Sequence, residues 1–174
     1  TVMPLTDSRT SLKDLVDDLV ADGSTAGHIG LAWGWYAVSS NFNSLFAGPG
    51  AGAHNPAETL KSVILMTDGE FNTNYCSGIL ANNAGYGGGD RIGNCNATNG
   101  SPYSQAEALC DAMKAQSITI YTVGFQVSSG SNAANILAYC ATSPSYAFLP
   151  ANGADLSDDF AAIGREITRL RISK

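Results

Sequence analysis

The stretch that most constrains the fold of this chain runs from Ser62 to Glu70 and reads S-V-I-L-M-T-D-G-E. After Ser62 the apolar residues follow one another without polar alternation, which is typical of a strand covered on both faces in a parallel sheet. The run ends in Thr67-Asp68-Gly69-Glu70, where the glycine permits a sharp turn and two carboxylates follow the strand. Ligands of open α/β sheets bind at the carboxyl ends of the strands. Asp68 is therefore the first candidate for a functional residue.

Strand and helix patterns alternate along most of the chain. Besides the strand at 62–66, β-rich runs predict strands at 118–125 and 146–149 and the end of another at 2–5. Apolar residues at helical spacing predict helices at about 11–21, 24–36, 104–113, 133–140 and 155–170. This alternation favours an α/β fold, with a three-layer, Rossmann-like and mostly parallel sheet that has helices on both faces.

Three local signals refine the helices. The first helix carries an apolar face opposite a charged one, and that apolar face consists of Leu12, Leu15, Val16, Leu19 and Val20. The glycines of the second helix each weaken it by about 1 kcal/mol relative to alanine, so we expect this helix to pack closely against the sheet. Ser104 and Glu107 have the spacing of a capping box, which predicts that the third helix begins at Ser104.

The four cysteines are Cys76, Cys95, Cys110 and Cys140. They include no C-x-x-C pair and match no zinc pattern, so we favour disulfides and hence an exported protein. Free buried cysteines in a cytosolic protein are the alternative. Cys110 and Cys140 lie on the apolar faces of two successive predicted helices, which flank one strand. We therefore expect Cys110 to pair with Cys140, and Cys76 with Cys95 across the irregular stretch between them.

Charge and hydropathy exclude several classes of function. Nine basic and fifteen acidic residues give a formal net charge of −6 and a pI near 4.6, which makes nucleic acid an unexpected partner. No apolar stretch approaches the roughly 20 residues that span a bilayer. The chain begins at Thr1 without a visible signal peptide, so we expect it to start inside a longer precursor.

Three motifs, taken in order, resemble the von Willebrand factor A domain. They are Ser24-Thr25-Ala26-Gly27 in a turn that opens a helix, Val63–Gly69 ending in T-D-G, and Ile120–Phe125 ending in V-G-F. Longer stretches resemble the bacterial TadG-like pilus-assembly proteins within that family, namely Thr25–Tyr36, Leu65–Thr73 and the C-terminal L-R-I-S-K. The resemblance covers nearly the whole chain except a variable Gly/Asn-rich loop at about 72–103.

The resemblance implies a metal-ion-dependent adhesion site. In that family a D-x-S-x-S motif after the first strand, a Thr from a second loop and an Asp from a third loop hold Mg²⁺, or Ca²⁺ or Mn²⁺. By the matching motifs, Thr25 would be the second-loop ligand and Asp68 the third-loop ligand. Hydroxyl and carboxylate oxygens suit such hard cations. No D-x-S-x-S follows an apolar strand in these 174 residues, so we expect the chain alone to bind metal weakly or not at all.

The same residues also have simpler interpretations. Asp68-Gly69 is common turn chemistry, Thr25 has the place of an ordinary N-cap, and Glu70 is expected to be an exposed loop acid. The sequence contains no G-x-S-x-G, no H-E-x-x-H and no P-loop, and His28 and His54 have no partner at metal-ligand spacing. We therefore expect no catalytic residues. In a hydrolytic enzyme, Asp68 and Glu70 would be the carboxylates to examine.

These observations predict one domain over residues 1–174, the C-terminal portion of a von Willebrand A-type domain without its D-x-S-x-S segment. The expected function is protein binding or adhesion within a pilus-assembly or surface protein, in the periplasm or at the cell surface. The expected partners are pilus or surface components, or the N-terminal segment that the chain lacks. The alternative is a structural subunit of a surface assembly with no functional metal site, because a sheet without its first strands exposes an edge to other chains.

Overall fold

In the part of the chain that the structure describes, a parallel sheet of three strands in the order β1-β2-β3 forms the centre. The computed structural model describes residues 2–20, 25–48, 50–72 and 99–172. For residues 170–172 it describes the backbone alone. The strands are β1 (Ser62–Thr67), β2 (Thr119–Gly124) and β3 (Ala147–Phe148). In the register, Ser62 is opposite Thr119 and Thr122 is opposite Ala147.

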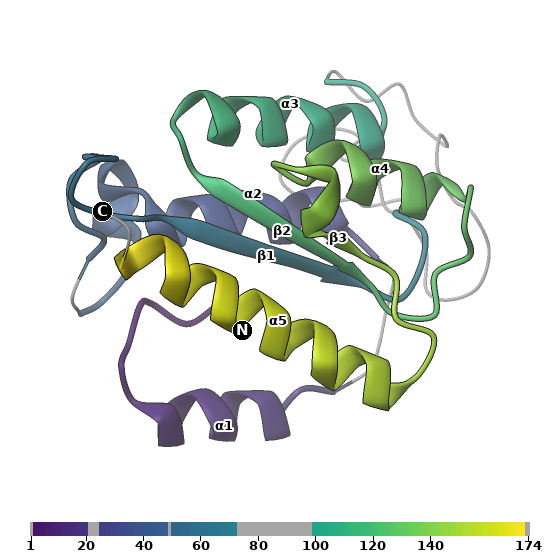
Figure 1. Ribbon diagram of the computed structural model, residues 1–174. Coiled ribbons are helices and arrows are strands. Elements are labelled where there is room, and N and C mark those ends of the chain that lie inside the picture. The colour runs from purple at the N-terminus through teal and green to yellow at the C-terminus, as the bar shows by residue number, and fades with distance from the viewer. Residues whose placement is uncertain (1, 21–24, 49, 73–98, 173–174) are drawn as a thin grey trace.

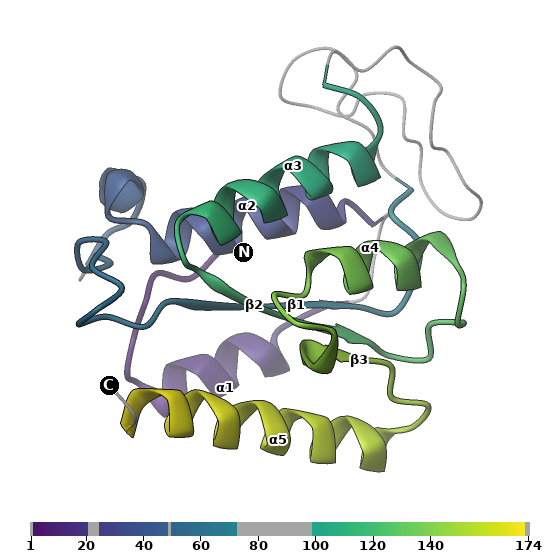
Figure 2. The same ribbon diagram turned by 45° about the horizontal axis from the view of Figure 1, so that its top comes forward.

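Helices cover both faces of this sheet, as Figures 1 and 2 show. On one face lie α2 (Gly27–Val38), α3 (Pro102–Ala115) and α4 (Asn132–Cys140). On the other lie α1 (Arg9–Asp17) and α5 (Gly153–Ile172). Two short 3₁₀ helices, Ser40–Leu45 and Pro144–Tyr146, belong to the connections. The predicted α/β class, with a parallel sheet between helical layers, is confirmed.

Each face of the sheet has its own hydrophobic core. The larger core joins β1 and β2 to α2, α3 and α4, and its buried side chains include Leu31, Leu65, Met113 and Ile120. The smaller core lies between β2 and α5, where Tyr121, Val123 and Ile163 are buried. The described residues therefore fold around one sheet with two apolar interfaces, as the alternation of elements requires.

Strand β1 differs from the prediction that both of its faces are covered. Val63, Leu65 and Thr67 are buried, whereas Ile64 and Met66, which point to the other face, are 41% and 45% exposed. The reason is that α5 packs on β2, where Tyr121 and Val123 are buried with Ile163, and the described residues leave the same face of β1 partly uncovered. The apolar run therefore predicted the strand correctly, but it did not predict how far each face of the strand is covered.

Helix α1 and the segment before it also depart from prediction. None of its nine residues is buried, and Val16 is 63% exposed on what we expected to be a core-facing side. The helix begins at Arg9 rather than Ser11 because the Ser8 side chain accepts the N–H of Ser11 (3.2 Å) and caps the helix. Residues 2–5 form no strand.

Helix α3 begins two residues before the predicted capping box. Ser101, not Ser104, is the N-cap, and its hydroxyl accepts the N–H of Ser104 (3.1 Å). Pro102 fits the first turn because its missing N–H would have no partner there. The remaining predicted elements after β1 agree with the structure to within two residues.

A disulfide joins α3 to α4. The Sγ atoms of Cys110 and Cys140 are 1.99 Å apart and their Cα atoms are 5.2 Å apart. This pairing is the one expected from the apolar faces of the two helices. Cys76 and Cys95 lie outside the described residues, so their pairing stays a prediction.

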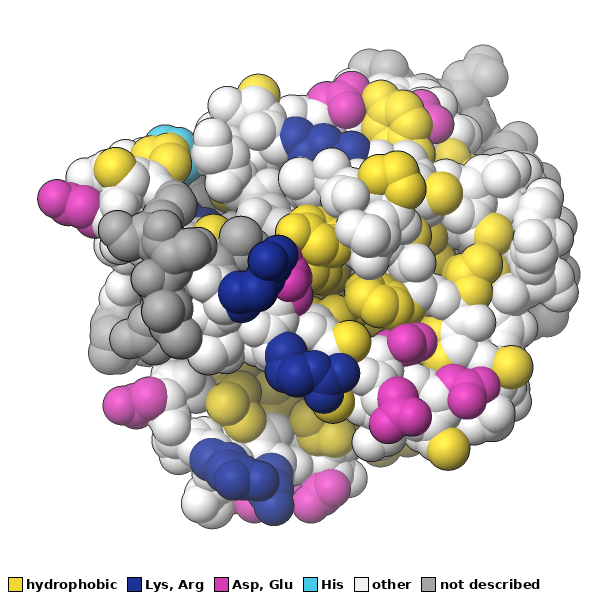
Figure 3. Space-filling view, in the orientation of Figure 1, with side chains coloured by type: hydrophobic (Ala, Val, Ile, Leu, Met, Phe, Trp, Pro, Cys, Tyr) yellow, Lys and Arg dark blue, Asp and Glu magenta, His cyan; other side chains and the backbone are white. Residues whose placement is uncertain are grey.

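The apolar side chains left uncovered are visible on the surface. Figure 3 shows hydrophobic side chains reaching the surface along the sheet between α4 and α5, and again between α5 and α1. Among the described residues, no helix has the length and apolar character needed to cross a membrane.

Candidate functional site at the carboxyl edge of the sheet

The turn after β1 presents Asp68 at the carboxyl edge of the sheet. The Thr67 hydroxyl donates to the carbonyl of Gly69 (3.0 Å) and accepts the N–H of Gly69 (3.3 Å), which closes the turn around Asp68. The Thr67 carbonyl also accepts the N–H of Phe125 after β2 (2.9 Å), so the turn is fastened to the neighbouring strand. Asp68 is exposed, and its carboxylate makes no hydrogen bond or ion pair with a described residue.

Thr25 lies beside the same loop. Its N–H donates to the Asn72 side-chain oxygen (2.7 Å), and its carbonyl accepts the N–H of Asn72 (3.0 Å). Gly27 then begins α2 directly against the ring of Phe71, where an added Cβ would lie 2.0 Å from a ring carbon. Only glycine allows this approach. The structure therefore brings the segments that carry Thr25 and Asp68 to one edge, although 43 positions separate the two residues in the sequence.

Glu70 connects three elements at this edge. One carboxylate oxygen accepts the hydroxyl of Tyr103 from α3, and the other accepts the N–H of Ala133 in the first turn of α4 (3.2 Å). The hydroxyl of Tyr103 also accepts the N–H of Phe71 (3.0 Å), and the rings of Phe71 and Tyr103 stack with centroids 5.4 Å apart. A carboxylate at a helix N-terminus satisfies an otherwise unpaired N–H and interacts favourably with the helix dipole.

This role of Glu70 corrects the prediction of an exposed loop acid. Glu70 is half-buried and braces the loop that holds Asp68 against α3 and α4. Its partners are 33 and 63 positions further along the chain. No local pattern reports a contact over that distance, so sequence reasoning had no signal from which to find it.

The residues present do not fit a complete metal site. Asp68 and Thr25 offer two hard oxygen ligands, whereas Mg²⁺ and Ca²⁺ take about six to eight. Within the described ranges, no three His, Cys, Asp or Glu side chains gather closely enough to hold a metal ion. His28 is buried in α2, where burial lowers the pKa of its imidazole, and His54 is exposed.

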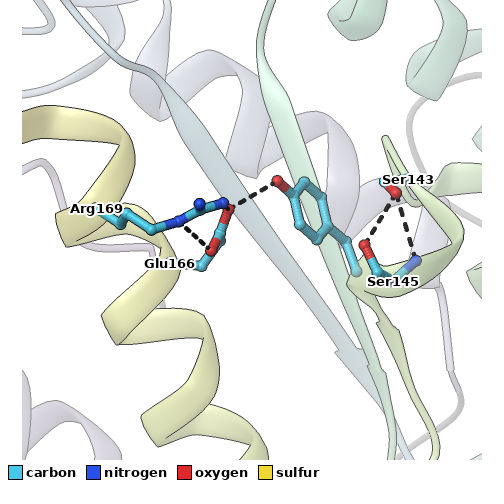
Figure 4. Close-up of polar contacts among 5 residues, drawn as sticks. Ser143, Ser145, Glu166 and Arg169 are labelled. Atoms are coloured by element: carbon cyan, nitrogen blue, oxygen red, sulfur yellow. Dashed lines mark hydrogen bonds and ion pairs between the residues drawn. The ribbon is translucent and has the colours of Figure 1, made fainter. Parts of the chain in front are cut away.

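A second polar cluster connects α5 to the 3₁₀ helix that precedes β3. Arg169 donates twice to Glu166 (2.7 and 3.0 Å), and the Tyr146 hydroxyl donates to the same carboxylate (3.2 Å). Figure 4 shows Glu166 and Arg169 pointing toward one another from α5. The hydrogen bond from Arg169 lowers the pKa of Glu166.

Tyr121 lies beside this cluster, with its ring 4.5 Å from that of Tyr146. Burial, followed by the nearby Tyr146 and Glu166, raises the pKa of Tyr121 to about 12. Its hydroxyl makes no hydrogen bond of normal geometry with a described residue. The cluster therefore supports α5 and includes one buried hydroxyl, that of Tyr121, whose hydrogen bonding is incomplete among the described residues.

Comparison with known proteins gives one distant structural match. No family model matches the sequence, and no curated protein matches it. The fold is similar to that of the vWF domain of the type V pili tip protein Mfa5 from Porphyromonas gingivalis, with 16% sequence identity and a TM-score of 0.37. The match covers 95% of this chain and 55% of that one, so this chain spans about half the length of that structure. A likeness this distant carries no inference about the site.

Proposed function

We propose that this chain is part of an exported, non-enzymatic protein-binding module of the von Willebrand A type. The observation that carries the proposal is the carboxyl edge of the sheet, where Asp68 is exposed without a partner among the described residues, on a loop braced by Glu70. A braced loop holds a carboxylate ready for a partner at low entropic cost. The motif resemblance supports placing the module in a TadG-like pilus-assembly or surface protein.

We further propose that Thr25 and Asp68 supply two ligands of a Mg²⁺ site that another segment completes. The disulfide between Cys110 and Cys140 supports a periplasmic or extracellular location, since such bonds persist in oxidising compartments. The partners would be pilus or surface proteins, or a segment of the same protein that contributes the D-x-S-x-S ligands.

The test compares Asp68→Ala with Asp18→Ala, an exposed acid of the α1 region, in the organism that produces the protein. We expect Asp68→Ala to abolish EDTA-sensitive surface attachment while the protein level stays normal, and Asp18→Ala to leave attachment unchanged. Calorimetry of the chain alone with MgCl₂ should show no binding tighter than millimolar. Micromolar binding would mean that the two-ligand account is wrong.

A structural subunit is the second candidate, and the exposed edge of β1 favours it. Ile64 and Met66 are half-exposed on a strand that pairs on one side only within the described residues, and an unpaired strand edge is a template for pairing with another chain. In that case Ile64→Lys should prevent assembly and Asp68→Ala should not. The opposite result supports the cation-dependent contact.

A further inference from the structure

The helices α3 and α4 lie side by side (Figures 1 and 2). Between them is a groove on the surface of the molecule. We call it the α3–α4 groove. Its volume is about 440 Å³, within the roughly 300–1,000 Å³ of small-molecule sites. The residues that matter for its chemistry are Tyr103, Glu107, Asn132, Asn135, Ile136 and Tyr139.

The walls of the groove are fixed relative to each other by two connections. The Cys110–Cys140 disulfide joins α3 to the last residue of α4. Near the first turns of both helices, Glu70 accepts hydrogen bonds from Tyr103 of α3 and from Ala133 of α4. A ligand would therefore meet a preformed surface, which reduces the ordering cost of binding.

Tyr139 provides an exposed aromatic ring whose orientation is already set. The residue is 44% exposed. Its hydroxyl donates to Asp111 (2.9 Å), and Lys114 lies over the ring with Nζ 5.2 Å from the centroid. The Lys114 ammonium also donates to the Tyr139 carbonyl (2.5 Å). The hydrogen bond to Asp111 and the contact with Lys114 set the orientation of the ring, and its exposed part is available for stacking.

The polar side chains of the groove have unused hydrogen-bonding capacity. Asn132 and Asn135, one turn apart on α4, are exposed, and their amides make no hydrogen bond with a described residue. The same holds for the carboxylate of Glu107 on α3. Each amide offers two donors and an acceptor in one plane, and the carboxylate offers acceptors alone. Such groups match adjacent hydroxyls, which donate and accept together.

We propose that the α3–α4 groove binds a neutral saccharide. The C–H face of a sugar ring would stack on Tyr139, and its hydroxyls would bond to Asn132, Asn135 and Glu107. The charge disfavours an anionic sugar, because the carboxylates of Glu107 and Asp111 outnumber the one ammonium, Lys114, beside Tyr139, and the chain carries a net charge of −6. An extended peptide fits less well, since both walls are helices and offer no strand edge.

The experiment titrates the oxidised chain, uniformly labelled with ¹⁵N, with maltohexaose, mannohexaose and chitohexaose, each to millimolar concentration. We expect at least one sugar to shift the amide resonances of Asn132, Asn135 and Tyr139. Tyr139→Ala should weaken that binding about tenfold and Asn135→Ala about fivefold. Tyr139→Phe should retain most of it, and Asn41→Ala, an exposed asparagine in another part of the molecule, should have no effect.

The proposal is overturned if none of the three sugars shifts groove resonances, if the shifts lie elsewhere, or if Tyr139→Ala binds as tightly as the unaltered chain. In each variant, amide resonances of residues outside the groove should stay unchanged, which verifies that the variant is folded. The inference goes beyond the protein contact proposed above, because it needs neither Asp68 nor a metal ion. If saccharide binding persists in EDTA and in the Asp68→Ala variant, the saccharide proposal is supported even where the test of the cation-dependent contact gives a negative result.

Discussion

Helices α1 and α5 lie on the same face of the sheet and have similar amphipathic sequences, but their burial is opposite (Figures 1 and 2). Ile163 of α5 is 1% exposed and packs on Tyr121 and Val123 of β2. Leu12 of α1 is 44% exposed, and no residue of that helix is buried. The two helices show that sequence periodicity determines which side of a helix is apolar. Burial of that side against another surface determines whether it stabilises the folded protein.

Truncation of Ile163 is the most direct way to challenge this comparison. Ile163→Ala should lower the free energy of unfolding by about 2–5 kcal/mol, because it leaves a cavity in the smaller core. Leu12→Ala should lower it by less than about 0.5 kcal/mol, because Leu12 is half-exposed. Urea unfolding followed by circular dichroism measures both. Equal losses would mean that α1 is packed against the protein in solution.

Reduction of the Cys110–Cys140 disulfide sharpens the same contrast on the other face. The bond closes a loop with a sequence separation of 30, and its loss should cost about 2–4 kcal/mol of unfolding free energy. The measurement is denaturant unfolding of Cys110→Ala/Cys140→Ala, a double variant that leaves Cys76 and Cys95 in place. An unchanged midpoint would show that α3 and α4 hold together through apolar packing alone.

Substitution of Glu70 tests whether its hydrogen bonds to Tyr103 and Ala133 stabilise the folded protein. Glu70→Gln should cost about 1–2 kcal/mol, since it weakens a charged hydrogen bond at the N-terminus of α4. The matched control is Glu58→Gln, an exposed loop acid bonded to the Asn55 side chain, which should cost less than about 0.5 kcal/mol. If both variants unfold at the same urea concentration, the contacts of Glu70 do not stabilise the fold.

The effect restricted to the narrowest conditions concerns Tyr121 beneath α5, because it is absent near neutral pH and develops only at alkaline pH. Its pKa is about 12 in the folded chain against an ordinary value of 10.0, so the folded state disfavours the phenolate. The resulting stability is fully present below pH 10 and is lost as the pH rises through 12. Tyr121→Phe should remove this part of the alkaline decline, as measured by unfolding at a series of pH values. An identical decline in the variant would assign the effect to other groups.

The comparison of α1 with α5 also explains how far sequence reasoning reached at the candidate site. The T-D-G turn and its Asp68 follow from an apolar run that stops at a glycine turn, all within nine residues. The proximity of Thr25 to that turn came only from the motif resemblance, and the structure connects the two segments through Asn72. The part played by Glu70 was missed because both of its partners come from elements later in the chain.

By itself the sequence determined the order of helices and strands from α1 onward, the parallel α/β class and the pairing of Cys110 with Cys140. These follow from periodicity, turn residues and caps, which depend on neighbours a few positions away. The tertiary structure alone decided that Ile64 and Met66 of β1 are half-exposed, that α1 leaves its apolar side uncovered, and that α3 and α4 form a braced groove. Such features depend on burial and on long-range hydrogen bonds. Both arise from contacts between elements far apart in the sequence, which the local sequence pattern does not specify.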